Sequence, residues 1–278
     1  ECEENCAQVM LVAGCNGNEG SHQTADDSVK IWYAYNTENL MQDLEYPELM
    51  AERDATLRMH GIRNEVESIQ LMITPSVNVN SFDFTMCDLK NAAGDVLAAD
   101  TFEIFAQWYT EVTESYNTDS YYGFYSDALV PLENYKTKRY NTIAAGRNQG
   151  LWVHANIPAD QAAGLYTGSG VLIVDGKEYE IPFEVTVYDA DMPQENNMRS
   201  AIAVWYDYIA KGEGFYSAEL GEAYYDFLVS KRVTPLKAED SIWKMSNVDG
   251  YIEWMVEQAQ DPMVSNYTLP YNSEKYEL

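Results

Sequence analysis

The sequence predicts a mainly β protein, in which an antiparallel β-sandwich is followed by the first βα units of an incomplete (β/α)8 barrel. Between residues 28 and 192, short runs of β-branched and aromatic residues alternate with turn signals and show almost no helical periodicity. From residue 193 onward, a strand pattern, two amphipathic helices and another strand follow one another, which is the order of a βα-repeat fold.

The first strands are predicted from local composition. Residues Val29–Tyr35, "VKIWYAY", are β-branched and aromatic, which favours a strand. Residues 39–54 are expected to form a short helix or an irregular crossing that ends near Pro47. Two strands follow within residues 55–76, and the second alternates with a heavier apolar set on one side, as in a half-buried strand.

The middle of the predicted sandwich is less regular. Strands are expected at 82–89 and 100–114, with a turn on Gly94 and Asp95 between them. Residues 115–146 are interpreted as a long, strand-poor loop. Residues 148–189 then predict three strands, and Asp175-Gly176 between two alternating runs indicates a tight hairpin.

The pattern changes between residues 192 and 199. The apolar run at 201–208, "AIAVWYDY", is typical of a strand buried on both faces. One helix is predicted from a Ser217 N-cap towards Pro235, and a second over 248–262. A further strand is predicted at 264–271. We therefore expect three parts: a leader or tether at 1–27, a β-sandwich at 28–192, and the start of a barrel at 193–278.

The length of the last part raises a question about the barrel. A closed (β/α)8 barrel needs about 200 residues or more, and residues 193–278 supply only about its first third. We expect the chain to be a truncated product or a part of a longer protein, because a partial barrel leaves open sheet edges. The alternative is that these residues form a small α/β appendage on the sandwich.

Composition excludes several classes of partner. The formal net charge is −28, which repels phosphate backbones and anionic lipid surfaces, so nucleic acid is not an expected partner. Neutral ligands such as sugars are compatible with this charge, and 22 Tyr and 6 Trp supply flat apolar rings with polar tips. No transmembrane helix, cofactor or metal site is expected, because no suitable apolar run, phosphate-binding glycine loop or clustered ligand set is present.

The cysteines suggest an export signal. Residues 11–15, "LVAGC", resemble a bacterial lipobox, in which the cysteine is lipidated and becomes the mature N-terminus. Cys15 is therefore a candidate lipidation site, and we expect an extracellular or cell-surface protein with a possible lipid anchor. The residues before it are acidic and lack a basic n-region, so an ordinary flexible leader remains the alternative. No disulfide pairing can be read from the spacing of the four cysteines.

Several motifs occur in an order that resembles one family. They are "RNEVESIQLMITP", "SDALVP", "AAGRNQGLWVHANIPADQAAGLYTGSGVLI", "VTVYDADMP", "YYDFLVSKRVTP" and "AQDPMVSNYTLPY". Together they resemble secreted bacterial proteins of the glycoside hydrolase family 123 type, over roughly residues 29–271. The resemblance implies an N-terminal β-sandwich followed by a (β/α)8 barrel.

The resemblance also implies a chemistry. Characterised members of this family are similar to exo-acting β-N-acetylgalactosaminidases, which use an adjacent Asp-Glu pair and the acetamido group of the substrate as the nucleophile, an exception to the usual two-carboxylate mechanism. In this sequence no Asp is followed directly by Glu. The expected catalytic pair is thus absent from these residues, and whether the chain itself is an enzyme stays open.

Substrate contacts are expected at the carboxyl ends of barrel strands. There, Trp205 and Tyr271 are candidates for stacking on a sugar, and Asp207 for accepting hydrogen bonds from hydroxyl groups. The alternative for Trp205 is packing inside the barrel, and for Asp207 capping of the next turn.

The leading functional hypothesis is the N-terminal region of a secreted hydrolase-like protein that acts on N-acetylhexosamine-containing glycans and is inactive as this fragment. A non-catalytic carbohydrate-binding or cell-surface module is the alternative. Polar residues of the sandwich such as Asn64, Gln70, Asn148 and Gln149 are interpreted as groups that hold loop backbone by hydrogen bonds.

Overall fold

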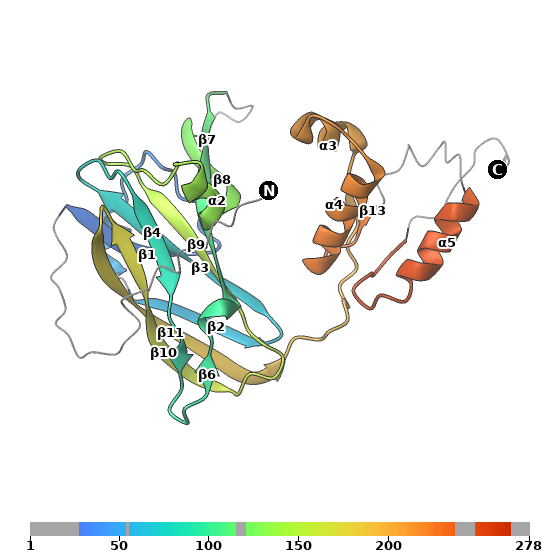
Figure 1. The fold of residues 1–278 in the computed structure, drawn as a ribbon, viewed down its shortest axis with the longest axis horizontal. Coiled ribbons are helices and arrows are strands. Elements are labelled where there is room, and N and C mark those ends of the chain that lie inside the picture. The colour runs from blue at the N-terminus through green and yellow to red at the C-terminus, as the bar shows by residue number, and fades with distance from the viewer. Residues whose placement is uncertain (1–27, 54–55, 115–120, 237–247, 268–278) are drawn as a thin grey trace, which may run out of the picture. The chain divides into compact units, whose positions relative to one another are not determined.

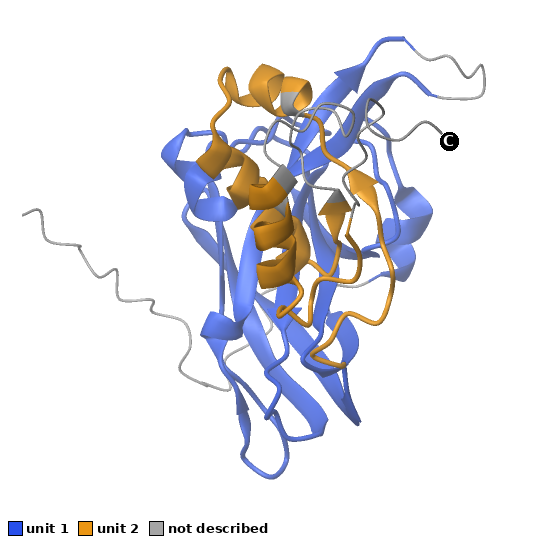
Figure 2. Cartoon of the chain, turned by 90° about the vertical axis from the view of Figure 1, so that its right-hand side faces the viewer, with its two compact units in different colours: residues 1–192 blue, residues 193–278 orange. Residues whose placement is uncertain are grey.

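A computed structural model describes residues 28–53, 56–114, 121–236 and 248–267 of the chain. The chain divides into two compact units, Glu1–Met192 and Pro193–Leu278, coloured separately in Figure 2. Each unit is described by itself below.

Unit 1 is a sandwich of two sheets, labelled in Figure 1. The first sheet has the order β1 (Val29–Tyr35), β3 (Val66–Pro75), β9 (Gln149–Asn156), β7 (Phe102–Val112), β8 (Gly123–Pro131). The second has the order β2 (Leu57–Arg63), β11 (Lys177–Asp191), β10 (Gly164–Val174), β5 (Leu89–Lys90), β6 (Val96–Leu97), and β4 (Phe82–Met86) also pairs with β10. Every strand pair of the described part of unit 1 is antiparallel except β2 with β11. The predicted mainly β, antiparallel architecture is therefore confirmed.

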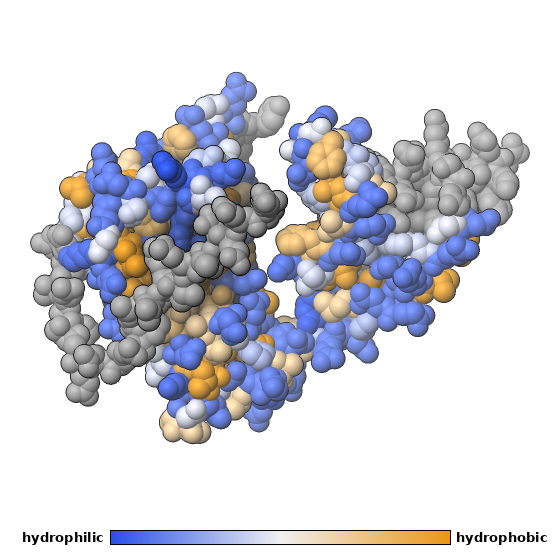
Figure 3. All heavy atoms as spheres, in the orientation of Figure 1, coloured by the Kyte–Doolittle hydropathy of each residue, from blue (hydrophilic) through white to orange (hydrophobic). Residues whose placement is uncertain are grey.

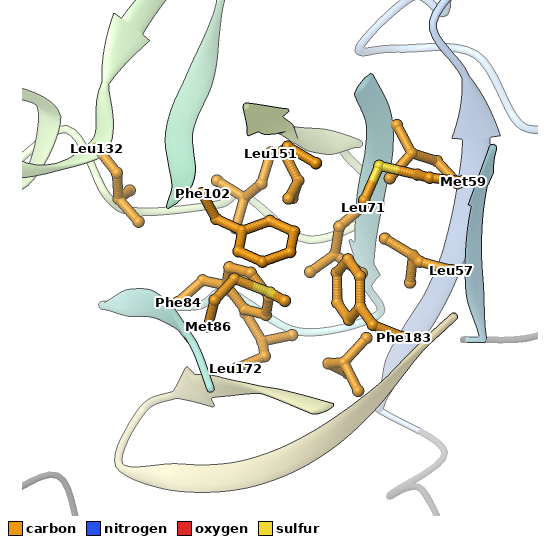
Figure 4. Packing of buried hydrophobic residues seen from close by; sticks show 14 of the residues in the cluster. Leu57, Met59, Leu71, Phe84, Met86, Phe102, Leu132, Leu151, Leu172 and Phe183 are labelled. Carbon is orange, nitrogen blue, oxygen red and sulfur yellow. The ribbon is translucent and has the colours of Figure 1, made fainter. Parts of the chain in front are cut away.

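The core lies between the two sheets. Leu71 of β3 and Leu151 of β9 point from one sheet towards Phe183 of β11 and Leu172 of β10 in the other (Figure 4), and these side chains are at most 1% exposed. Burial of this kind contributes about 1.5–3 kcal/mol for each large apolar side chain, so the facing sheets supply the main stabilisation of unit 1.

The outer face of the first sheet is also covered. Residues 36–46 and α1 (Pro47–Glu52) lie over it, and Trp32, Leu40 and Met72 are buried there in a second apolar cluster. As a result β3 is buried on both faces along much of its length, whereas the sequence predicts a half-buried strand. The expectation that a helix ends near Pro47 is wrong: Pro47 begins α1, where its missing N–H costs no hydrogen bond.

Residues 115–146 contain more structure than the sequence predicts. The described part of this stretch holds the edge strand β8 and the helix α2 (Leu132–Thr137). Most residues of β8 are half-buried or exposed, so the strand carries little apolar alternation to be recognised by. By contrast, the hairpin on Asp175-Gly176 is confirmed, and both residues have positive φ, 47° and 80°, as a type I′ turn requires.

Unit 2 contains a small parallel strand pair and three helices among its described residues. The strands β12 (Ile202–Ala203) and β13 (Pro235–Leu236) pair in parallel. The helices are α3 (Tyr206–Glu213), α4 (Ala218–Ser230) and α5 (Val248–Gln258). The predicted Ser217 N-cap is confirmed, since its side chain accepts a 3.2 Å hydrogen bond from the amide of Leu220.

Two expectations for unit 2 are wrong. Residues 201–208 do not form one strand buried on both faces, because β12 is two residues long and exposed and α3 begins at Tyr206. Residues 264–267 are not in a strand, and the rest of the predicted strand at 264–271 lies outside the described residues. Whether unit 2 begins a (β/α)8 barrel stays a prediction.

The visible surface carries mainly hydrophilic residues with scattered hydrophobic ones (Figure 3). A 3-10 turn at Ala99–Thr101 leads into β7.

Within the described ranges, we find no helix whose length and apolar character would let it cross a bilayer.

Candidate functional site

A chain of amide side chains lies buried on the outer face of the first sheet, under residues 36–46. Gln70 of β3 and Gln107 of β7 form it and are at most 1% exposed. Gln149 of β9 is equally buried, but it lies in register with Ile73 of the core and donates 3.0 Å hydrogen bonds to the strand carbonyls of Gln107 and Gly150, so it does not hold loop backbone as predicted. Gln107 donates to the side-chain oxygen of Gln70, whose Nε2 in turn donates 2.6 Å and 2.8 Å hydrogen bonds to the carbonyls of Tyr35 and Glu38. The predicted role of Gln70 in holding loop backbone is thereby confirmed.

Asn148 holds a later part of the same covering segment. Its Nδ2 donates to the carbonyls of Met41 at 2.9 Å and Leu44 at 2.7 Å. Its Oδ1 accepts a 2.7 Å hydrogen bond from Thr74, whose hydroxyl oxygen accepts a 3.0 Å bond from the indole of Trp32. Buried polar groups are tolerable when their bonds are made, so this arrangement is a structural network that fixes the covering segment.

Tyr109 completes the network. Its hydroxyl donates to Gln107 Oε1 at 2.8 Å and accepts a 3.1 Å bond from the amide of Gly150. Burial raises the pKa of Tyr109, so the phenol stays protonated and keeps donating at any physiological pH.

A second polar cluster fixes the point at which the chain leaves unit 1. The guanidinium of Arg63 at the end of β2 pairs with Asp191 at 2.5 Å and with Asp189 at 3.0 Å. Asn64, at φ 60°, donates through Nδ2 to the carbonyl of Met192 at 3.0 Å. The amide of Met192 donates to the carbonyl of Arg63 at 2.8 Å. The end of β11 is thus tied to the β2–β3 turn.

In the described part of the chain, no carboxyl group with a shifted pKa is suited to donate a proton. The pKa of Glu38 is lowered mainly by its hydrogen bond from Arg53, and that of Asp191 mainly by its bond from Arg63. The pKa of Glu219 is lowered mainly by a backbone hydrogen bond at the start of α4. The general acid of a glycosidase needs a raised pKa so that it is protonated near neutral pH, and none of these three groups has one. Among the described residues there is also no group of three His, Cys, Asp or Glu that could hold a metal ion.

The predicted substrate contacts belong to unit 2. Trp205 is the N-cap residue of α3 and is 61% exposed, and Asp207 is exposed in the first turn of that helix. Both follow the carboxyl end of β12, whereas Tyr271 lies outside the described residues. Their role in binding stays a prediction.

Hydroxyl groups gather at the opposite ends of the two short strands. Ser200, before β12, accepts a 2.8 Å bond from the amide of Thr234, before β13. Thr234 is fully buried, and its hydroxyl lies 3.0 Å from that of Ser265. Because ligands bind at the carboxyl ends of parallel strands, this cluster at the amino ends is interpreted as structural.

Comparisons with known proteins decide the family. Residues 37–173, from the segment after β1 into β10, match the model of the glycoside hydrolase 123 N-terminal domain. A family 123 glycoside hydrolase from Clostridium perfringens has a similar fold, with a TM-score of 0.55 at 16% identity over 73% of this chain. The chain is a glycoside hydrolase family 123-like protein.

The family 123-like chain spans 35% of the length of the Clostridium perfringens structure. The CooA pilin subunit from enterotoxigenic Escherichia coli is 12% identical, with 59% of this chain and 99% of the pilin covered, but its TM-score of 0.27 is too low to support a conclusion. A search of curated proteins gave no match.

Sequence reasoning missed several residues that organise this family 123-like sandwich. Gln107 and Tyr109 look like ordinary strand residues, and Thr74 like a strand end. A signal was present, since Gln70 and Gln107 are amides whose direct neighbours in the strand are apolar or aromatic. These two residues are 37 positions apart in the sequence, so only the folded chain shows that their side chains meet.

Proposed function

We propose that unit 1 is the supporting sandwich of a glycoside hydrolase that acts on N-acetylhexosamine-containing glycans. The observation that supports this most directly is the match of residues 37–173 to the glycoside hydrolase 123 N-terminal domain. The Clostridium perfringens structure with a similar fold was described for glycolipid glycan hydrolysis, which is consistent with a glycan substrate.

Residues 1–278 by themselves are proposed to be inactive. In the sequence no Asp is followed directly by Glu, and among the described residues none of the three carboxyl groups with shifted pKa values has a raised pKa. In unit 2, Trp205 and Asp207 are proposed to contact the sugar at the carboxyl end of β12, together with Tyr271. The barrel that would carry these contacts is likewise part of the proposal.

Two assays test these statements. The polypeptide encoded by the whole gene is expected to release 4-nitrophenol from 4-nitrophenyl N-acetyl-β-galactosaminide or 4-nitrophenyl N-acetyl-β-glucosaminide, and residues 1–278 are not. Turnover by residues 1–278 above the enzyme-free blank would refute their inactivity. A whole polypeptide that binds such glycans without cleaving them would favour the alternative, a non-catalytic carbohydrate-binding or cell-surface module.

We also propose that the protein is exported to the cell surface or medium. Cys87 is disulfide-bonded, and disulfides persist in oxidising compartments outside the cytosol. Anchoring through a lipid on Cys15 is one form of this proposal, and secretion with an unlipidated leader is the other.

A further inference from the structure

A row of aromatic rings runs from the core of unit 1 to its surface, beside α2. Phe82 is 1% exposed and lies 6.2 Å from the ring of Tyr135, which is 6% exposed. The Tyr135 ring contacts both Trp108 at 6.2 Å and Tyr140 at 5.7 Å. Trp108 and Tyr140 are 39% and 47% exposed, so the outer end of the row is open to solvent.

Trp108 lies opposite an irregularity in the sheet. The pairing of β7 with β8 shifts register between Gln107 and Tyr109, so Asp127 and Ala128 lie opposite Trp108 alone. The extra residue belongs to β8, and β-bulges are common next to functional sites. The side chains of its two neighbours, Gln107 and Tyr109, are hydrogen-bonded in the buried amide network, which fixes the stretch of β7 that carries the indole.

Tyr140 is held by the end of α2. The amide of Arg139 donates to the carbonyl of Lys136 at 2.8 Å, and that of Tyr140 to Tyr135 at 3.0 Å. These two bonds are a Schellman motif, whose usual apolar contact is here the Tyr135–Tyr140 ring pair. The motif places Arg139 at φ 57°, a conformation that favours glycine and costs about 1 kcal/mol in other residues.

Together the two exposed rings form an aromatic corner. The centroids of Trp108 and Tyr140 are 5.2 Å apart and their planes meet at 69°. We infer that this corner is a saccharide-binding site on the sandwich, in which Trp108 stacks on the apolar face of a neutral sugar ring and Tyr140 contacts its edge. Asp127, exposed on the strand opposite Trp108, is placed to accept hydrogen bonds from sugar hydroxyls.

The exposed area of the aromatic corner and the net charge of the chain favour a neutral sugar as its ligand. Exposures of 39% and 47% leave about 200 Å² of Trp108 and Tyr140 open, whereas a stable protein–protein interface buries about 800 Å² on each partner. The net charge of −28 disfavours an anionic ligand. A neutral sugar matches both limits, and the choice of a sugar also rests on the proposed function.

The test is glycan binding by residues 1–278, without hydrolysis. An array of neutral oligosaccharides that end in N-acetylgalactosamine or N-acetylglucosamine identifies a bound probe, and calorimetric titration of that probe gives its Kd. Trp108→Ala and Tyr140→Ala are each expected to raise the Kd about tenfold or more, as for other buried-contact aromatics. Trp108→Phe keeps a flat ring and is expected to restore most of the affinity.

Tyr188→Ala is the matched control, because Tyr188 is 52% exposed but lies on β11 in the other sheet. The urea midpoint of each variant shows whether it is folded. Equal Kd values for wild type and Trp108→Ala, or no binding of any neutral glycan by wild type, would overturn the inference. So would a wild-type dimer that Trp108→Ala dissociates in ultracentrifugation. None of these outcomes bears on hydrolysis by the whole polypeptide, so the proposed function is tested separately.

Discussion

Asn148 and Met41 are 107 positions apart in sequence, yet the buried amide of Asn148 donates a 2.9 Å hydrogen bond to the carbonyl of Met41. This contact, with its partner to Leu44, joins the segment that covers the first sheet to the start of β9. The cover is what buries β3 on both faces.

Removal of this contact is expected to destabilise unit 1. Asn148→Ala leaves two carbonyls and the hydroxyl of Thr74 without their buried partner, which should lower the free energy of unfolding by about 2–3 kcal/mol. Urea denaturation followed by circular dichroism measures the change. Asn197→Ala, at an exposed asparagine, is the control and should change the midpoint little. Equal midpoints for the two variants would contradict the proposed role of the network.

The network also depends on the absence of a side chain at one position. A Cβ atom at Gly150 would overlap with the side chain of Gln107, so Gly150→Ala should destabilise unit 1 by about 1–3 kcal/mol through overpacking. At Gly212 in α3 no atom lies within 4 Å of an added Cβ, and Gly212→Ala should be neutral or stabilise by up to about 1 kcal/mol. Thermal unfolding of the two variants tests this contrast, and a tolerated Gly150→Ala would show that the network can rearrange.

The ion pair of Glu38 with Arg53 predicts a pH dependence. Nη2 of Arg53 donates to Glu38 at 2.8 Å, and the pKa of Glu38 is lowered in the folded protein. The stabilisation of the folded protein by this ion pair is therefore fully present above the pKa of Glu38 in the unfolded chain, about 4.3. It is lost as the pH falls through the lower pKa of Glu38 in the folded protein.

Glu38→Gln should thus reduce stability at pH 7 by at most about 1 kcal/mol, because the pair is partly exposed. The difference in the free energy of unfolding between wild type and variant should disappear at acidic pH. Urea titrations between pH 7 and pH 3 measure it, with the exposed Glu48→Gln as a control. A difference that is independent of pH would mean that the ion pair contributes nothing as an ion pair.

Cys87 can distinguish the two forms of export. Lipidation of Cys15 would remove Cys2 and Cys6 with the leader and modify Cys15 itself, which leaves Cys87 without a partner in the same chain. Because Cys87 is disulfide-bonded, we expect a non-reducing digest of the exported protein to contain a Cys87 peptide linked to a peptide from residues 1–27. A reduced sample is the control. A free Cys87 thiol together with a lipid on Cys15 would contradict this expectation.

Strands with strong local patterns were predicted from sequence with little error. The predicted bounds of β1 and the hairpin on Asp175-Gly176 agree with the structure, because β-branched residues and a two-residue turn act over short distances. The helix α4 was recognised by its Ser217 cap. The predicted strand at 201–208 failed because an apolar run alone does not separate a buried strand from the start of a helix.

The role of some site residues could also be predicted from sequence, whereas that of others could not. The sequence suggested that Gln70 and Asn148 hold loop backbone, since an amide on a strand needs a partner, but it could not name Met41 or Glu38 as the partners. The aromatic corner was not predicted, because Trp108 lies on a strand opposite a β-bulge and Tyr140 follows the end of a helix, 32 residues further along the chain.

The class of unit 1, the positions of most of its strands and the family they resemble could all be inferred from the order of the residues alone. Those features follow from period-two patterning, turn residues and charge, which act between neighbours in the chain. Which sheet face is covered, where the amide network closes and which aromatic rings reach solvent became visible only in the folded chain. These depend on contacts between residues tens of positions apart, whose free energy exists only after the chain has folded.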